Sequence, residues 1–235
     1  MSDLIDTAEM YLKAVFELQE EGILPMRARI AERLGHSGPT VSQTVARLER
    51  DGLMMVSGDR HLELTERGRA RATQVMRKHR LAERLLVDVI GLDWPHVHEE
   101  ACRWEHVMSE QVESKLVTLL GQPTHDPYGN PIPGLAELGM PQSQDLAVEN
   151  LAAIAQPQPR QARLIRLGEP LQVDVELLAQ MEGLGIGPGV AVQVRRDDAE
   201  VIIGVEGAAT ELEVSDDIAK HIFVRTGAAG SGTGA

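Results

Sequence analysis

The chain has 235 residues, a length that suits one to three domains. Only 3% of its residues are aromatic, so its cores are expected to be aliphatic, and aromatic stacking platforms for single-stranded nucleic acid are not expected. A single cysteine excludes an internal disulfide and fits a reducing compartment. The acidic start lacks the pattern of a signal peptide, and no apolar run approaches the length of a membrane span. We therefore expect a cytoplasmic protein with no membrane association.

The charge of the chain is unevenly distributed. The formal net charge is −13, which argues against a general polyanion binder. Residues 22–80, however, hold twelve Arg and Lys against six Asp and Glu, a local charge of +6, so the remainder carries −19. A basic module on an acidic chain is the pattern expected of contact with a phosphate backbone. On charge alone, an ordinary solvated surface explains the segment equally well.

The N-terminal third has the pattern of a winged helix-turn-helix. Apolar residues at helical spacing predict an amphipathic helix over 3–20, followed by helices over 27–34 and 39–50. Two short strands are expected at 53–56 and 61–64, around a polar turn that includes Arg60. In such a module the second helix of the helix-turn-helix enters the major groove, and the wing tip lies near phosphate. The pattern, together with the positive charge, predicts DNA binding.

Two long helices are expected next, one from residue 65 to about 90 and one over about 95–120. Both carry more apolar surface than a small winged domain can cover. A two-fold dimer interface would bury that surface, and dimeric helix-turn-helix proteins read palindromic half-sites.

The stretch 79–106 holds four of the eight histidines and the cysteine. His79 and Glu83 are i,i+4 neighbours on one helix face. On the next helix a second face is shared by the residues His98, Cys102, Glu105 and His106. Imidazole, thiolate and carboxylate on a common face are what a transition-metal site needs. The alternative is a polar helix face with a core cysteine.

The C-terminal part changes to short strands. Residues 141–159 are expected to form a linker and 227–235 a disordered Gly-rich tail. Between them, strands are expected at 161–167, 189–195, 200–205, 210–214 and 222–225, with a helix at 174–182. These elements predict a small β-barrel.

Five runs of sequence closely resemble the iron-dependent repressors of the diphtheria toxin repressor type. They are RARIAERL at 27–34, SGPTVSQTV at 37–45, MRKHRLAERL at 76–85, EACRWEHVMS at 100–109 and GNPIPG at 129–134. The resemblance covers residues 1–140 almost without interruption. It implies a mainly α fold with a small β part: a winged helix-turn-helix over 1–73, a helical metal-binding and dimerisation domain over 74–140, and an SH3-like barrel over 160–226.

The same resemblance implies two metal sites per chain. One would use His79, Glu83 and His98, joined from the barrel by Glu169 and Gln172. The other would use Met10, Cys102, Glu105 and His106. Taken locally, Met10 is most often a core filler, and a Glu-x-x-Gln pair such as Glu169 and Gln172 is usually surface. Soft sulfur ligands beside imidazole and carboxylate favour Fe²⁺ over Mn²⁺, with Zn²⁺, Co²⁺ and Ni²⁺ also compatible.

The resemblance also implies which residues meet DNA. Ser37, Pro39 and Gln43 would face the bases. Residues near phosphates would be Arg27, Ala28, Thr40, Ser42, Arg47, Arg50 and Arg60. Because Pro39 and Ala28 cannot donate side-chain hydrogen bonds, readout of DNA shape is expected to matter.

The sequence leaves three functions open. The expected one is a non-enzymatic, Fe²⁺-activated repressor of iron-acquisition genes that binds a double-stranded operator as a homodimer and takes no small organic substrate; a manganese-responsive repressor is its variant. A metalloenzyme on His79, Glu83 and His98 would need a general base such as Glu99 or Glu100, but no substrate pocket is predicted and the basic helix-turn-helix would be unexplained. A winged-helix regulator with an organic effector and structural metals is the third. These functions are distinguished by whether DNA binding depends on the concentration of free metal.

Overall fold

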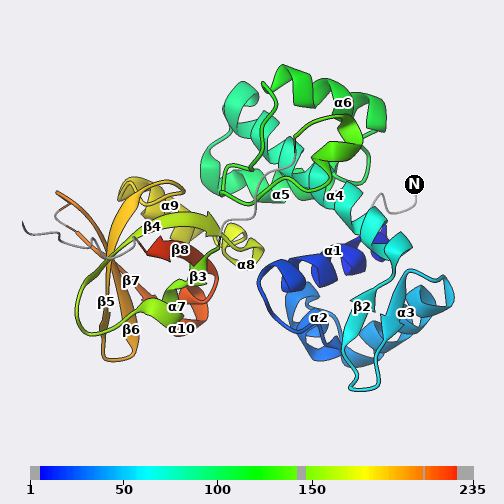
Figure 1. Cartoon of the computed structure of the whole chain (residues 1–235), viewed down its shortest axis with the longest axis horizontal. Coiled ribbons are helices and arrows are strands. Elements are labelled where there is room, and N and C mark those ends of the chain that lie inside the picture. Colours follow the sequence, from blue (N-terminus) through cyan, green and yellow to red (C-terminus); the bar gives the residue numbers. More distant parts are fainter. Residues whose placement is uncertain (1–5, 142–146, 209, 227–235) are drawn as a thin grey trace, which may run out of the picture. The chain divides into compact units, whose positions relative to one another are not determined.

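The computed structural model describes residues 6–141, 147–208 and 210–226 (Figure 1). Within them the chain forms two compact units. The first comprises residues 6–92, 97–126 and 132–141, and the second comprises 93–96, 127–131 and the described residues from 147 onward. Among the described residues, no helix is both long and apolar enough to cross a membrane.

The first unit begins with the three helices of the helix-turn-helix. They are α1 (Thr7–Glu20), α2 (Arg27–Leu34) and α3 (Gly38–Arg50). Asp6 caps α1 through hydrogen bonds from two backbone amides, and Ser37 caps α3, where Pro39 occupies the first turn. Residues 3–5 of the expected first helix lie outside the described residues, and the helices otherwise agree with the prediction.

The wing follows as a hairpin of β1 (Met54–Val56) and β2 (Leu62–Leu64), paired antiparallel with Met54 opposite Leu64. Its turn contains Arg60, whose φ of 70° lies in the left-handed region. Apolar side chains of the helices and of both strands form one core, which includes Leu12, Val45 and Leu62. The predicted winged helix-turn-helix is confirmed.

The helix α4 (Glu66–Leu85) continues into a π-helical turn, η1 (Leu86–Ile90). Thr65 caps it, and Gly68 in its first turn is required by packing: a Cβ there would come within 1.8 Å of the Leu53 carbonyl oxygen. The expected domain boundary at residue 73 lies inside α4. The first unit therefore joins the helix-turn-helix and the helical part through a continuous helix.

The single helix expected over about 95–120 is wrong. The segment is divided into η2 (Trp94–His96), α5 (Val97–Trp104) and α6 (Glu110–Leu119). Ser109 explains the break, because its hydroxyl accepts a hydrogen bond from the Val112 amide and starts a new helix. The periodicity of apolar residues continues across the break, so periodicity alone did not reveal it.

Buried ion pairs hold the helical part together. Arg77 on α4 pairs with Glu113 of α6 at 2.5 Å and donates to the Gly134 carbonyl oxygen at 2.8 Å, next to η3 (Leu135–Leu138). Around it lies a small apolar core of Leu81, Val117, Ile132 and Leu135. These contacts fix α4 relative to α6.

The second unit contains a six-stranded antiparallel sheet in the order β3-β8-β4-β5-β6-β7. The strands are β3 (Glu149–Asn150), β4 (Arg160–Leu167), β5 (Ala191–Asp197), β6 (Glu200–Val205), β7 (Leu212–Ser215) and β8 (Ile222–Thr226). Its helices are α7 (Leu151–Ile154), α8 (Glu169–Gln172), α9 (Val175–Gly183) and α10 (Asp216–Ala219). The expected strands and the expected helix are confirmed, with shifts at their ends.

Two boundaries of this unit differ from expectation. The linker expected over 141–159 is wrong in part, because β3 pairs with β8 and α7 buries Leu151 and Ile154. Residues 127–131, expected in the helical domain, pack in this unit: Asn130 donates to the Leu167 carbonyl oxygen at 2.9 Å. The tail over 227–235 lies outside the described residues.

Candidate metal centre

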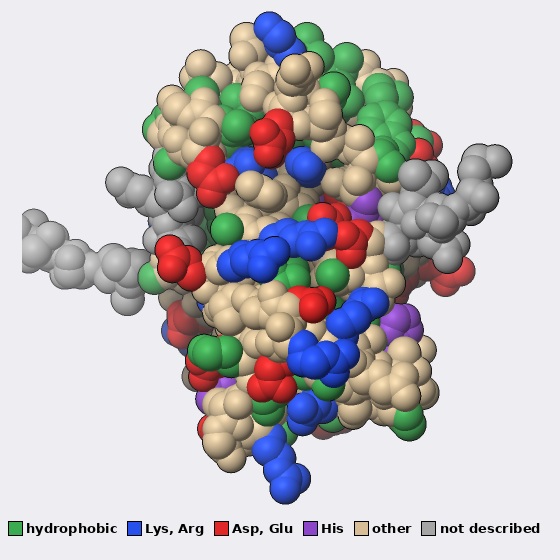
Figure 2. Space-filling view, turned by 90° about the vertical axis from the view of Figure 1, so that its right-hand side faces the viewer, with side chains coloured by type: hydrophobic (Ala, Val, Ile, Leu, Met, Phe, Trp, Pro, Cys, Tyr) green, Lys and Arg blue, Asp and Glu red, His purple; other side chains and the backbone are tan. Residues whose placement is uncertain are grey.

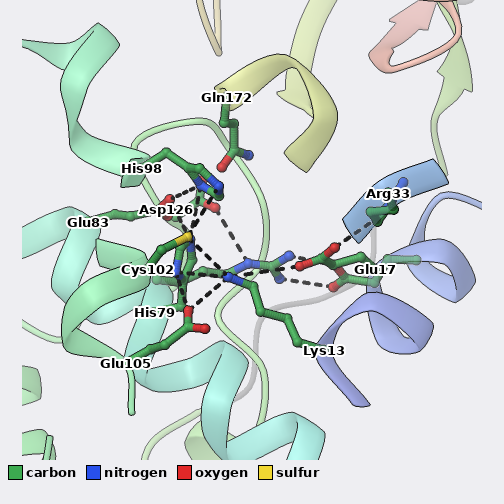
Figure 3. Close-up of polar contacts among 12 residues, drawn as sticks. Lys13, Glu17, Arg33, His79, Glu83, His98, Cys102, Glu105, Asp126 and Gln172 are labelled. Atoms are coloured by element: carbon green, nitrogen blue, oxygen red, sulfur yellow. Dashed lines mark hydrogen bonds and ion pairs between the residues drawn. The ribbon is translucent and has the colours of Figure 1, made fainter. Parts of the chain in front are cut away.

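The candidate ligands of α4 and α5 lie in direct contact (Figure 3). The Nε2 atom of His79 is 2.8 Å from Glu83 Oε1 and 3.2 Å from Nδ1 of His98. The other ring nitrogen of His98, Nε2, is 3.5 Å from Cys102 Sγ. His79 and Glu83 are fully buried, His98 is nearly so, and Cys102 is half-buried. The i,i+4 spacing on both helices therefore places four candidate ligands in one cluster.

The two nitrogens of His79 face different groups. Its Nε2 faces Glu83 and His98, whereas its Nδ1 is 2.6 Å from Oε2 of Glu105. The two ligand sets proposed from the sequence therefore meet at this imidazole. Glu105 is 3% exposed, so the contact is shielded from water.

Two charged residues of α1 reach the end of this cluster. The Lys13 ammonium lies 2.8 Å from Glu105 Oε2, and Glu9 Oε2 lies 2.7 Å from Nδ1 of His106. The second nitrogen of His106 is 3.2 Å from the other oxygen of Glu105. The cluster thus connects α4 and α5 to the first helix of the DNA-binding module.

The environment strongly favours protonated imidazoles. Burial opposes charge on His79, but Glu83 and Glu105 hold its pKa well above the ordinary value. Burial opposes charge on His98 as well, but hydrogen bonds with Cys102 and Glu83 raise its pKa to about 10. Both imidazoles therefore stay protonated to a higher pH than a free imidazole does.

The same environment favours anionic sulfur and carboxylate. Burial would raise the pKa of Cys102, but Lys13 and His79 lower it to about 5. Burial would also raise the pKa of Glu105, which the same two cations lower to about 2. A thiolate is the form of cysteine that binds metals, so Cys102 is prepared for that role.

The donor set fits a transition metal. One ligand atom from each of His79, His98 and Cys102 lies within 4.8 Å of the others. Two donors bound to one metal at roughly 2.0–2.3 Å stand about 3–4 Å apart, which matches the separation of His79 Nε2 and His98 Nδ1; Cys102 contacts the other nitrogen of His98. Nitrogen, sulfur and carboxylate donors suit Fe²⁺, Co²⁺, Ni²⁺ or Zn²⁺.

The residues proposed to meet DNA are presented to solvent. Nine of the ten are exposed on α2, α3 and the wing, and the tenth, Arg27, is half-buried. The hydroxyls of Ser37 and Thr40 lie 2.8 Å apart at the start of α3. Figure 2 shows Lys and Arg side chains gathered on the lower part of this face, at the height where Figure 1 draws α2, α3 and the hairpin.

Three family models match the chain in succession. They are the N-terminal DNA-binding domain of iron-dependent repressors over 3–62, the metal-binding and dimerisation domain of iron-dependent repressors over 65–134, and the diphtheria toxin repressor SH3 domain over 150–226. The chain belongs to the iron-dependent repressor family. This family consists of transcriptional repressors, not enzymes, so the metalloenzyme alternative is set aside.

Curated relatives of this repressor are similar over most of their length. The iron-dependent repressor IdeR of Mycobacterium tuberculosis is 57% identical over 197 residues, which cover 83% of this chain and 86% of the relative. The diphtheria toxin repressor of Corynebacterium efficiens is 54% identical over 226 residues, covering 95% and 97%. That of Corynebacterium diphtheriae is 52% identical, covering 95% and 99%.

Solved structures of metal-dependent repressors have the same fold. A manganese-dependent transcriptional repressor in complex with manganese is 27% identical with a TM-score of 0.80, covering 94% of this repressor and all of that chain. ScaR with bound Zn²⁺ is 26% identical with a TM-score of 0.75, covering 94% and 100%. The predicted three-part architecture is thereby confirmed.

Three further predicted ligands of the repressor belong to helices other than α4 and α5. Met10 is half-buried on α1, on the face that carries Glu9 and Lys13, but no polar contact of its sulfur occurs among the described residues. Glu169 and Gln172 belong to α8 in the second unit and are buried, contrary to the surface position usual for such a pair. The amide of Gln172 donates to the Leu167 carbonyl oxygen at 3.0 Å, and its own oxygen is buried with no hydrogen-bond partner among the described residues. That oxygen therefore has no hydrogen bond to lose if it binds a metal.

Lys13 belongs to the cluster but is not among the predicted site residues. The signal was present: residues 11–18 of the repressor are buried without interruption, so Lys13 and Glu17 are charges set inside an apolar run. Charges in such a run are stabilised only by buried partners. One partner of Lys13 is Glu105, 92 residues away, and periodicity cannot reveal that distance.

Proposed function

We propose that the chain is an Fe²⁺-activated repressor that binds palindromic operators of iron-uptake genes as a homodimer in the cytoplasm. The observation that carries the proposal is the contact of the ligand cluster with α1. Glu105 and His106 meet Lys13 and Glu9, which lie on the helix that packs beneath the helix-turn-helix. A metal at this place would bear on the position of the DNA-binding module, and a ligand shifts an equilibrium only through such differential contacts.

We assign the ligands to two sites per chain. His79, Glu83 and His98 would hold one metal, with Glu169 and Gln172 added from the second unit. Met10, Cys102, Glu105 and His106 would hold the other. A divalent cation there would balance the thiolate and the carboxylate and join α1 to α5.

Iron is the metal that the donors favour. Sulfur from Cys102 and Met10 beside imidazole and carboxylate is softer than the all-oxygen surroundings that suit Mn²⁺. The relatives at 52–57% identity are named iron-dependent or diphtheria toxin repressors, while the manganese-dependent repressor with solved coordinates is 27% identical. A manganese-responsive repressor is the second candidate on the strength of that fold likeness.

DNA binding and dimerisation use different surfaces. The ten residues on α2, α3 and the wing would contact the operator, with Gln43 and Ser37 toward the bases and Arg47 and Arg50 toward phosphates. Large apolar side chains, 50–62% exposed, remain on the helical part: Val89, Ile90, Val107, Val112 and Leu119. A second copy would cover them, since exposed apolar groups of this kind mark interaction sites.

An anaerobic DNA-binding titration tests the proposal. The protein is stripped of metal and titrated onto a palindromic duplex with Fe²⁺, Mn²⁺ or Zn²⁺, and a chelator then reverses each reaction. We expect Fe²⁺ to give tight, chelator-reversible binding at concentrations where Mn²⁺ does not. Equal binding with and without metal would overturn metal activation, and a response to Mn²⁺ alone would favour the manganese reading.

A further inference from the structure

The Lys13 ammonium occupies a buried position among candidate metal ligands. Its Nζ lies 2.8 Å from Glu105 Oε2, 3.1 Å from His79 Nδ1 and 3.8 Å from Cys102 Sγ (Figure 3). Lys13 is only 7% exposed. Two of these three atoms belong to residues of the site assigned to Met10, Cys102, Glu105 and His106. A positive side chain therefore stands where a cation held by Cys102 and Glu105 would be bound.

A second acceptor lies one turn further along α1. Oε1 of Glu17 is 3.9 Å from the Lys13 ammonium, and Oε2 of the same carboxylate is 3.1 Å from Arg33 on α2. Arg33 also contacts Glu21 at 3.0 Å. Figure 3 shows Lys13 between the ligand cluster and the Glu17–Arg33 pair. The chain of contacts thus leads from Glu105 to a helix of the helix-turn-helix through a single ammonium.

We propose that Lys13 competes with the metal for Glu105 and Cys102, so that it sets the metal concentration at which the site fills, and that the displaced ammonium moves to Glu17. The inference rests on the proposed function, because it takes Cys102 and Glu105 as ligands.

Like charges at this separation in a buried site repel strongly, because little water screens them. The metal is divalent and the ammonium monovalent, and Lys13 has a flexible four-carbon stem, so the ammonium is the group that moves. Glu17 is the acidic side chain at i+4, which is within reach of a rotamer change. There the ammonium shares a carboxylate with Arg33. Metal binding then alters a contact between α1 and α2 without any ligand on α2.

Neutral variants of Lys13 test the competition. Lys13→Met and Lys13→Gln are compared with wild type and with Lys115→Met, whose side chain is exposed on α6. Affinity for Co²⁺ is measured at fixed pH against a competing chelator. Both Lys13 variants are expected to bind at least about tenfold more tightly, because a nearby positive charge is gone, and Lys115→Met is expected to match wild type. Loss of the Lys13 charge also strengthens the binding of protons to Glu105 and Cys102. It strengthens the binding of a divalent ion more, because the ion carries twice the charge. Unchanged or weaker binding by the Lys13 variants overturns the proposal.

A double-mutant cycle with Glu17→Gln tests where the ammonium goes. In wild type, Glu17→Gln should weaken Co²⁺ binding, because the displaced ammonium loses its acceptor. In the Lys13→Met background the same change should have no effect on affinity. Equal effects in both backgrounds would exclude Glu17 as the acceptor. Circular dichroism and gel filtration of each variant establish that the folded dimer is being measured, and Lys13→Gln retains a hydrogen-bond donor if Lys13→Met unfolds.

Cys102→Ala separates the inference from the proposed function. If Cys102→Ala weakens Co²⁺ binding and the Lys13 variants do not strengthen it, the metal site stands and the competition is overturned. If Cys102→Ala leaves the affinity for Co²⁺ unchanged, the assigned metal site is wrong. The competition proposal fails with it, because any tighter binding by the Lys13 variants would then come from a different site.

Discussion

Oε2 of Glu105 lies 2.6 Å from Nδ1 of His79, and both side chains are buried. The resemblance to the iron-dependent repressors implies that these two residues belong to different metal sites. Their contact means that the imidazole of His79 touches both proposed ligand sets, so we expect that a metal in one proposed site would change the electrostatics of the other.

Removal of either proposed sulfur ligand should abolish the dependence of operator binding on metal. Cys102→Ala and Met10→Ala are expected to abolish metal-dependent operator binding while the dimer stays folded, because the remaining ligands no longer join α1 to α5. We expect the metal affinity of Cys102→Ala to fall by about tenfold or more. Met55→Ala, at an exposed methionine of β1, is the control and should behave as wild type. Operator binding as tight as that of wild type at limiting Fe²⁺ would refute the coupling.

Metal binding should release protons and strengthen as pH rises. The pKa of His98 is about 10 and that of His79 is well above its ordinary value, so both rings are protonated at pH 7 and must lose protons to bind a metal. Cys102, with a pKa of about 5, contributes no proton at pH 7. Affinity should therefore rise between pH 6 and 9, with about one to two protons released per site filled. Calorimetry in buffers of different ionisation enthalpy counts these protons, and a pH-independent affinity would count against the assignment.

The fully buried Arg80 should be essential for stability. It pairs with Glu20 at 2.5 Å and with Asp126 at 3.5 Å. Arg80→Met would leave the buried Asp126 and the half-buried Glu20 without their cation, at a cost of about 3–5 kcal/mol in the free energy of unfolding. Arg84→Met is the matched control, because Arg84 is about a third exposed and pairs with Asp88 near the surface; its loss should cost under about 1 kcal/mol. Urea unfolding compares the two, and equal losses would contradict the argument.

Gly129 should tolerate no side chain. Its φ is +87°, and a Cβ would meet the Ile165 carbonyl oxygen at 2.0 Å. Gly129→Ala therefore forces the backbone of 127–131 away from β4, at a cost of about 2 kcal/mol or more. Gly185 has a similar φ of +70° but open space around it, so Gly185→Ala should cost only about 1 kcal/mol for the backbone conformation. A thermal shift of the same size for both variants would show that the close approach does not matter.

Operator affinity should depend steeply on salt. Four arginines of each chain are assigned to phosphates, namely Arg27, Arg47, Arg50 and Arg60, and each contact releases counterions. Arg47→Ala and Arg50→Ala should each weaken binding across sequences and reduce the slope of log affinity against log salt by about one. Arg225→Ala, at an exposed arginine of β8, should leave the slope unchanged. A salt-insensitive wild type would oppose docking of α3 in the groove.

Local patterns in the sequence determined most of the fold. The helical spacing of apolar residues in α1, α2 and α3 and the short strands expected after residue 160 predicted elements that the structure confirms, because each depends on residues a few positions apart. The same locality explains the errors. The break before α6 depends on the Ser109 cap, which competes with a periodic pattern that runs through it, and β3 exists only because it pairs with β8.

The sequence alone predicted that His79, Glu83, His98, Cys102, Glu105 and His106 are ligand candidates, because helical spacing and donor chemistry are both local properties. The tertiary structure decided how they meet: α5 lies against α4, so that Cys102 reaches His98, and α1 brings Lys13 to Glu105 across 92 positions of the chain. The ionisation of the cluster follows from that arrangement, since burial and neighbouring charges act through space. Local sequence patterns therefore do not show which buried charged groups contact one another.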